Sequence, residues 1–393
     1  MKAPAKPVCA ALAMTLALAP ISACTSSGSD DAQQNAPTAQ SEQNQNAISV
    51  TTSVTKHEKF DAAVLEISPE DFDGMGFSFG DSCDISFSNG YTLTDVPYFN
   101  GYYVQKGSPV IVAYPNSGSV NIAINNNDMW TPAGLADGDT VTITMNTPGK
   151  YLTTYEALAQ SYSTDRADYA TDEQFCNFRA LSGGNLKENF LYRGATPLDN
   201  SRNRAAVCDA LLEQAGITDV IDLADSEAEV QKYFADASFA SNYTKSLYGN
   251  GRVALLSMSS NYDAASYKTS LATGMRHLIE YGGPAYIHCT EGKDRTGFVC
   301  MLLEALAGAS YDEMLSDYMK TYENYFGITE ESDPERYSAI ASLYFSDFMK
   351  CLYGTDDASE LKSADFTDSA KSYLVDCGMT SEEIERLVAV ISK

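Results

Sequence analysis

The sequence is short of positive charge: 26 lysine and arginine residues stand against 53 aspartate and glutamate residues, and the formal net charge at pH 7 is −27. Nucleic acids and anionic membrane lipids bind basic surfaces, so this balance argues against both as bulk partners. Histidine is scarce as well, and His57, His277 and His288 do not have the spacing of metal ligands. We therefore expect no metal or other cofactor, and a local cluster of donors must attract any anionic ligand.

Long apolar runs are also missing after the N-terminal residues, so the sequence predicts no membrane-spanning helix there. At the N-terminus, two lysines precede an apolar segment, residues 7–20, which has the layout of an export signal. The segment leads into Ile21-Ser-Ala-Cys24, and small residues before a cysteine resemble the lipobox of bacterial lipoproteins. The resemblance implies a signal peptide at residues 1–23, acylation of Cys24 and an exported, lipid-anchored protein of the cell envelope or cell surface. A plain secretory peptide is the alternative.

Amino-acid composition separates residues 24–47 from residues 48–160. Residues 24–47 consist mainly of small and polar residues without any aromatic one, which predicts a disordered tether. Residues 48–160 contain short runs in which apolar and polar residues alternate, such as Cys83 to Phe87 before Asn89-Gly90, and this pattern predicts an all-β accessory domain. Its many tyrosines are interpreted as core and cross-strand pairs, with a carbohydrate or peptide platform as the alternative.

One stretch combines a thiol, an arginine and a run of backbone amides around an anion-sized hollow. Residues 284–288 are typical of a buried strand, and residues 296–307 predict a helix that ends at Gly308. The loop between them lies at a helix N-terminus, where unpaired N–H groups and the helix dipole attract anions. Cys289 and Arg295 have five residues between them, which places the sulfur beneath a phosphorus atom while the guanidinium group holds two phosphate oxygens. A structural cysteine with a chance spacing is the alternative.

This stretch resembles a family signature. Residues 288–297 read His-Cys-Thr-Glu-Gly-Lys-Asp-Arg-Thr-Gly, which is similar to the HCxxGKDRTG signature of the bacterial atypical protein-tyrosine and phosphoinositide phosphatases. Further blocks of the sequence resemble the same family: Asn177–Gly184, Leu191–Gly194, Val220–Leu223, Asp317-Tyr318 and Gly378–Ile384. The resemblance covers about residues 165–393 and implies a catalytic domain with the cysteine-dependent phosphatase fold.

The order of strands and helices predicted in residues 165–393 indicates an α/β fold independently of the family resemblance. Strands are predicted at residues 190–193, 219–223 and 252–256, and helices at residues 204–215 and 263–281. Such alternation forms a parallel sheet flanked by helices, with the ligand at the carboxyl ends of the strands. Further helices are predicted at residues 311–326, 334–353 and 380–391. Tyrosines in the first of these are interpreted as core, with a lid over the site as the alternative.

The loop residues imply a reaction. A neighbouring arginine and a helix N-terminus favour the thiolate form of Cys289, which makes its sulfur a nucleophile. The resemblance implies that this sulfur forms a phosphocysteine intermediate, while Arg295 and the loop amides stabilise the transition state without a metal. The phosphate-binding loop would contact the substrate through Thr290, Glu291, Gly292, Lys293 and Thr296. His288 is expected to shape the loop rather than to act as an acid or a base.

A proton donor is needed for the leaving oxygen. The resemblance suggests Asp294, with a carboxylate that only shapes the loop as the alternative. Asp222 and Asp225, at and just after the end of a predicted strand, are the other candidates. The sole tryptophan, Trp130, lies in the predicted β domain, so the tryptophan-proline-aspartate lid of ordinary tyrosine phosphatases is absent.

The sequence departs from the family pattern at two positions where charged residues are usual. Ala180 replaces an aspartate, and Ala224 replaces an arginine that would lie near the rim of the pocket. The substrate therefore stays open between a phosphorylated protein, an inositol phosphate such as phytate or a phosphoinositide, and a phosphorylated ligand that is bound with little turnover. Arg179 and Arg193 are candidates for substrate contacts, with ion pairing as the alternative.

Overall fold

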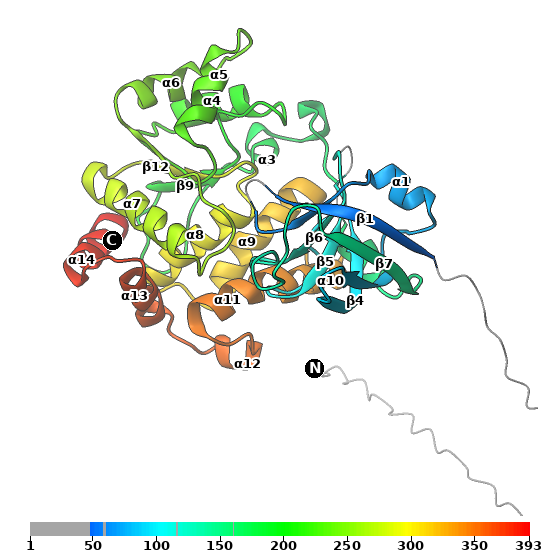
Figure 1. The fold of residues 1–393 in the computed structure, drawn as a ribbon. Helices are drawn as coiled ribbons and strands as arrows, with labels where there is room; N and C mark the ends of the chain where they lie inside the picture. The colour runs from blue at the N-terminus through cyan, green and yellow to red at the C-terminus, as the bar shows by residue number, and fades with distance from the viewer. Residues whose placement is uncertain (1–47, 58–59, 115–116, 160) are drawn as a thin grey trace, which may run out of the picture. The chain divides into compact units, whose positions relative to one another are not determined.

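Two β-sheets, a closed barrel and a five-stranded sheet, organise the computed structural model of the chain (Figure 1). The structure describes residues 48–57, 60–114, 117–159 and 161–393. The predicted signal peptide, its lipidation site Cys24 and the predicted tether lie outside the described residues. None of the helices in this described part is long and apolar enough to cross a bilayer.

The barrel occupies the region in which alternating runs predict strands. Its strands are β1 (Ser49–Lys56), β2 (Ala63–Leu65), β3 (Ser82–Phe87), β4 (Thr92–Phe99), β5 (Pro109–Val112), β6 (Asn121–Ile124) and β7 (Thr140–Thr147). They follow the order β1-β2-β6-β5-β4-β3-β7, and neighbours are antiparallel except for the parallel pair β4 and β5. Alternate residues face the core, as Ile85 and Phe87 are buried while Ser86 between them is exposed.

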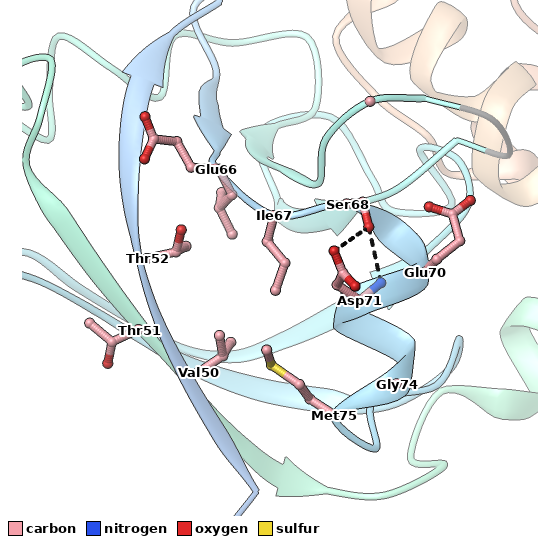
Figure 2. A pocket seen from close by; sticks show the side chains of 12 residues that line it. Val50, Thr51, Thr52, Glu66, Ile67, Ser68, Glu70, Asp71, Gly74 and Met75 are labelled. Atoms are coloured by element: carbon pink, nitrogen blue, oxygen red, sulfur yellow. Dashed lines mark hydrogen bonds between the residues drawn. The ribbon is translucent and has the colours of Figure 1, made fainter.

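One short helix of the barrel region, α1 (Pro69–Gly74), borders a surface hollow of about 690 Å³ beside β1 (Figure 2). Ser68 caps this helix, because its hydroxyl oxygen accepts a hydrogen bond from the N–H group of Asp71 at 3.1 Å. The same hydroxyl donates to the carboxylate of Asp71 at 2.9 Å. The hollow is lined by apolar side chains such as Val50 and Ile67 and by carboxylates such as Glu70. The residues predicted to act on a phosphate are not among those that line it.

The second sheet belongs to the region with the alternating strand and helix pattern. Its strands are β8 (Arg179–Ala180), β9 (Leu191–Gly194), β10 (Asp219–Asp222), β11 (Val253–Leu255) and β12 (Ala285–His288). They follow the order β11-β10-β12-β9-β8, and all neighbours are parallel except for β8 and β9. Asp222 lies opposite His288, and His288 lies opposite Gly194. The carboxyl ends of the three central strands therefore meet where the loop at Cys289 begins.

Helices and helical turns precede, separate and follow these strands along the chain. Their bounds are α2 (Leu152–Leu158), the 3₁₀ turn η1 (Arg166–Asp168), α3 (Asp172–Phe175), α4 (Ala205–Gln214), α5 (Glu227–Ala235), α6 (Asn242–Gly249), α7 (Ala265–Tyr281), α8 (Asp294–Leu306), α9 (Tyr311–Phe326), α10 (Pro334–Ile340), the π-helical turn η2 (Ala341–Phe345), α11 (Ser346–Tyr353), α12 (Ala358–Leu361), α13 (Thr367–Asp376) and α14 (Ser381–Ile391). Helix α8 contacts β9 and β12, and its residues from Thr296 to Leu306 are all buried. A helix that is buried on every side belongs to the core, so the loop before it is held by a rigid element.

The C-terminal helices differ from the prediction in one place. The single helix predicted at residues 334–353 is interrupted by η2, in which hydrogen bonds span one more residue than in an α-helix. The last helix begins as predicted, with Thr380 and Glu383 forming a capping box. Tyr318 and Tyr322 of α9 expose 1% and 3% of their surface, which agrees with a place in the core rather than in an open lid.

The barrel and the helical part contact each other within one compact unit that includes all the described residues. Helix α2 follows the barrel and contacts α10, and Arg336 donates a hydrogen bond to the carbonyl oxygen of Glu156 at 3.3 Å. The boundary expected between residues 48–160 and residues 165–393 stays a prediction.

Candidate active site

The loop that joins β12 to α8, residues 289–293, forms the candidate active site. Cys289 directly follows β12, and 4% of its surface is exposed. Gly292 has a φ of +68°, and a Cβ atom there would lie 2.2 Å from the carbonyl oxygen of Gly194, so this position requires glycine. The turn at Gly292 brings the loop against the end of β9 before α8 begins at Asp294.

The carbonyl oxygens of residues 290–292 are all bound by protein donors. The N–H group of Thr196 donates to Thr290, and the hydroxyl group of Tyr325 donates to Glu291. The side chains of Asn177 and Arg193 both donate to Gly292. At that shared oxygen, of Gly292, the distances are 3.2 Å from the amide and 2.8 Å from the guanidinium group. The loop N–H groups, together with those of the first turn of α8, are then the groups left to bind an anion.

A buried ion-pair cluster supports the loop from the protein side. Arg193 is fully buried, and its guanidinium group pairs with Asp317 of α9 as well as with the loop. Arg179 pairs with the same carboxylate at 2.7 Å. Burial acts to raise the pKa of Asp317, but the two guanidinium groups hold it below its usual range. For Arg179 and Arg193 the structure shows ion pairing, which is buried rather than at the surface.

Arg295 lies in the first turn of α8 and reaches back toward the loop. Its guanidinium group donates to the hydroxyl oxygen of Thr290 and to the carbonyl oxygen of Met258, each at 3.1 Å. Burial acts to lower the pKa of Arg295, but neighbouring acidic groups, with the Cys289 side chain first among them, raise it, and the net change is upward. The hydroxyl group of Thr296, the next residue, is buried without a hydrogen-bond partner among the described residues. The structure thus brings the predicted thiol, arginine and threonines together.

Lys293 and Asp294 lie where the loop meets α8. The ammonium group of Lys293 is 3.6 Å from the carboxylate of Asp294 and 5.7 Å from the ring centroid of Tyr322. The hydroxyl group of Tyr318 donates to the carboxylate of Asp294 at 3.5 Å. The Asp294 side chain is 46% exposed, so its carboxylate can reach solvent and a ligand.

The other two candidate acids, Asp222 and Asp225, lie deeper in the protein. Asp222 is fully buried, and one of its oxygens accepts hydrogen bonds from the N–H groups of Ala224 and Asp225 at 2.8 and 3.1 Å. Burial raises the pKa of Asp222 to about 6. Burial and the neighbouring charge of Asp222 raise the pKa of Asp225 to about 7, while Tyr233 donates to its carboxylate at 3.2 Å. Each carboxyl group keeps one oxygen without a partner among the described residues.

His288 is the last residue of β12 and is fully buried. Burial lowers its pKa to about 4, so the imidazole is neutral at pH 7. Its Nδ1 atom is 3.3 Å from the carbonyl oxygen of Cys289 and 3.9 Å from the carboxylate of Asp222. A neutral donor behind the loop fits the expected shaping role. Within the described residues, no group of three or more histidine, cysteine, aspartate or glutamate side chains could hold a metal ion.

Comparison with known proteins identifies the family. The profile of the tyrosine phosphatase family matches residues 173–392, which is more than half of the chain and includes the Cys289 loop, Arg193 and Asp317. The chain belongs to the tyrosine phosphatase family.

Individual relatives of this tyrosine phosphatase family member are distant or short matches. A Cupriavidus necator protein described as a candidate tyrosine-protein phosphatase is 40% identical over 55 residues, which are 14% of this chain and 20% of the relative's length. The structure of TpbA from P. aeruginosa is 16% identical, with 54% of this chain and 96% of that chain covered and a TM-score of 0.23. An uncharacterized conserved protein from Thermotoga maritima is 20% identical, with 24% of this chain and 35% of that chain covered and a TM-score of 0.21.

Residue patterns did not reveal every part of this tyrosine-phosphatase loop. The carboxylate of Glu291 accepts a hydrogen bond from the hydroxyl group of Tyr162 and lies 3.7 Å from the guanidinium group of Arg202. The ring of Tyr162 in turn stacks on Tyr325 with a centroid distance of 4.8 Å. Tyr162 precedes the family match, and nothing in its sequence context marks it. Asn177, by contrast, stands in a block that resembles the family and could have been found there.

Proposed function

We propose that the protein is a phosphomonoester hydrolase of the protein-tyrosine phosphatase type that works through a phosphocysteine intermediate at Cys289. The observation that carries the proposal is the loop of residues 289–293. Its thiol is nearly buried at the N-terminus of a core helix, its carbonyl oxygens face protein donors, and Arg295 is held beside it by Thr290. The family of the chain supports the same chemistry.

In the proposed reaction, the thiolate of Cys289 attacks the phosphorus atom and the bond from phosphorus to the ester oxygen breaks. The leaving oxygen takes a proton from Asp294. Water then attacks the phosphocysteine, gives a proton back to Asp294 and releases phosphate and the thiolate. Arg295 and the loop N–H groups stabilise the charge on the transferred group in both steps, so the chain's own donors supply the electrostatic stabilisation. The hydroxyl group of Thr296, which has no hydrogen-bond partner among the described residues, is available to the sulfur as it leaves.

The exposure of Asp294 supports its role as the proton donor, because the leaving group departs toward solvent. Asp225 is the second candidate, since a pKa of about 7 keeps part of its carboxyl group protonated at neutral pH. Its surface is only 6% exposed, so it is less accessible to a leaving group than Asp294. Asp222, with a pKa of about 6 and full burial, is the third.

We also propose that the protein is exported and anchored in the cell envelope or at the cell surface by a lipid on Cys24, with no membrane contact other than this lipid and no nucleic-acid partner. The proposed substrate is a phosphorylated protein or a small phosphomonoester. An inositol phosphate such as phytate, or a phosphoinositide, is the alternative. Capture of a phosphorylated ligand with little turnover is the third possibility.

The test measures phosphate release from an aryl phosphate by the full-length chain. Cys289→Ser is expected to lower kcat by about 10³-fold or more, because the serine hydroxyl is a far weaker nucleophile here. The matched control is Cys351→Ser, a partly exposed thiol of α11, which should keep the activity. Undiminished hydrolysis by Cys289→Ser would disprove the mechanism. A panel of phosphotyrosyl peptide, phosphoinositide and phytate then separates the substrate classes.

A further inference from the structure

A short segment that precedes the family match, residues 161–169, contacts the loop of residues 289–293. The hydroxyl group of Tyr162 donates a hydrogen bond to the carboxylate of Glu291, the middle residue of that loop. Burial, and after it the charge of Glu291, raise the pKa of Tyr162, so the hydroxyl group keeps its proton and remains a donor. The loop is therefore held in part by a residue outside the family match.

Two stacked tyrosines hold both the side chain and the backbone of Glu291. The ring of Tyr162 stacks on that of Tyr325 in α9, with a centroid distance of 4.8 Å and an angle of 19° between the ring planes. Tyr325 donates from its own hydroxyl group to the carbonyl oxygen of Glu291 at 2.8 Å. Because the rings pack on each other, a displacement of one would disturb both hydrogen bonds to the loop.

The guanidinium group of Arg204 keeps this segment in place. Arg204 exposes 2% of its surface, and its guanidinium carbon lies 4.8 Å from the ring centroid of Tyr162 and 4.9 Å from that of Tyr325. The same group donates hydrogen bonds to the carbonyl oxygens of Ser163 at 3.0 Å and Phe175 at 2.6 Å. A cation that is shielded from water binds aromatic faces more strongly than an exposed one, so the ring of Tyr162 is firmly held.

The carboxylate of Glu291 needs such restraint if the loop binds phosphate. Glu291 stands two residues after Cys289, in a loop whose N–H groups are proposed to surround an anion. A carboxylate that turned toward this anion would repel it, because like charges a few ångströms apart interact strongly where water is partly excluded. In the structure, the guanidinium group of Arg202 also lies 3.7 Å from this carboxylate and 6.0 Å from the ring centroid of Tyr162. Both neighbours hold the carboxylate beside the tyrosine pair.

We propose that Tyr162 is a positioning residue of the active site, which holds the Glu291 carboxylate away from a bound phosphate group. This inference rests on the proposed phosphatase function and adds residues 161–169 to the part of the chain that carries it. Glu291 then binds the anion through its N–H group, while its carboxylate anchors the loop. The functional unit thus includes residues that precede the family match, which starts at residue 173.

The test uses the full-length chain and measures KM for an aryl phosphate and, by titration calorimetry, Kd for inorganic phosphate. Tyr162→Phe removes the hydroxyl group and keeps the stacked ring. It should raise both constants about tenfold, as expected for the loss of a hydrogen bond to a charged group, while kcat changes by less than about threefold. In a Glu291→Gln background the same substitution should change either constant by less than about twofold, because a neutral amide does not repel phosphate.

The matched control is Tyr243→Phe, which removes a hydroxyl group that donates to the carbonyl oxygen of Ile217 at 2.6 Å. It should leave both constants unchanged. If the unmodified chain binds phosphate but hydrolyses no ester, the proposed function fails, and the Kd values alone then test Tyr162. If the chain hydrolyses the ester and Tyr162→Phe leaves both constants unchanged, or raises them equally in the Glu291→Gln background, the phosphatase proposal stands and the positioning role is wrong.

Discussion

The barrel and the five-stranded sheet both enclose apolar cores, but they differ in the charge that they bury. Among the described residues of the barrel, Asp81 is the buried charged residue, and N–H groups of Ser78 and Gly149 each donate to its carboxylate at 2.7 Å. Around the sheet, the buried charged or titratable residues include Arg193, Asp222, Asp225, His288 and Glu304. Several of these keep a polar atom without a partner among the described residues.

This difference shows where the chain accepts a cost in stability. An unpartnered polar atom in the interior costs free energy. Among the described residues of the barrel region, a turn satisfies the buried carboxylate of Asp81, and the unpartnered buried side-chain atoms are the neutral amide oxygens of Asn100 and Asn121. Around the sheet the unpartnered atoms include those of titratable groups, and those of Asp222, Asp225 and His288 lie at or just after the carboxyl ends of strands, near the loop that is proposed to bind phosphate. A local departure from favourable burial is typical of a functional site.

The largest expected effect breaks the ion-pair cluster beside the sheet. Asp317→Asn leaves the guanidinium groups of Arg179 and Arg193 buried without their counter-charge, so the free energy of unfolding should fall by about 3–5 kcal/mol in urea titrations. The barrel provides the control in Lys150→Gln, which removes the exposed pair with Asp95 and should change stability little. If both variants lost the same free energy of unfolding, the buried ion-pair cluster beside the sheet would contribute no more to stability than the exposed pair of the barrel.

The second comparison sets two glycines with similar φ angles against each other. Gly292→Ala places a Cβ atom 2.2 Å from a carbonyl oxygen and should cost about 2–4 kcal/mol, with loss of aryl phosphate turnover. Gly149 after β7 has a φ of +64° and no atom near its Cβ position, so Gly149→Ala should cost about 1 kcal/mol and keep turnover. Retained turnover in Gly292→Ala would contradict the tight loop.

The third test keeps the positive charge of the site and changes its shape. Arg295→Lys loses the planar pair of donors, so kcat/KM for an aryl phosphate should fall by about 10²-fold. Arg202→Lys, at the exposed pair with Glu291, is the matched control and should have a much smaller effect. A similar loss in both variants would mean that charge alone matters.

The smallest expected effect concerns the pH dependence of stability. Because the folded protein raises the pKa of Asp225 to about 7, its protonated form is favoured, and this stabilisation is lost as the pH rises from about 4 through about 7. Between pH 5 and pH 8, the free energy of unfolding of the unmodified chain should therefore fall by about 1–2 kcal/mol more than that of Asp225→Asn. Identical pH slopes of the unfolding free energy would show that the buried carboxyl does not carry the effect.

Sequence patterns were sufficient for the elements that are defined locally. The apolar run before Cys289 and the helical run after it appear as β12 and α8, and Thr380 and Glu383 form the expected cap. Alternating runs at residues 82–87 and 140–147 appear as barrel strands. Each of these strands and helices is defined by residues that are close in sequence, so its periodicity can be read from the sequence alone.

Contacts between distant residues could not be predicted in the same way. The donation from Arg193 to Gly292 spans 99 positions, and the bond from Lys106 to Asp347 spans 241. The local sequence does not identify these partners, since an arginine in a strand and a lysine in a turn can each pair with many distant groups. The shared pairing of Arg179 and Arg193 with Asp317 therefore became visible only in the folded chain.

The π-helical turn η2 affects how the helices pack beside the candidate active site. One additional residue in a helical turn rotates every later side chain by about 100° around the helix axis. With this offset, Phe345 and Phe348 both pack on Tyr318 of α9. Deletion of a single residue from η2 would regularise the helix and turn Asp347 of α11 away from Lys106, the residue between β4 and β5 whose N–H group donates to its carboxylate.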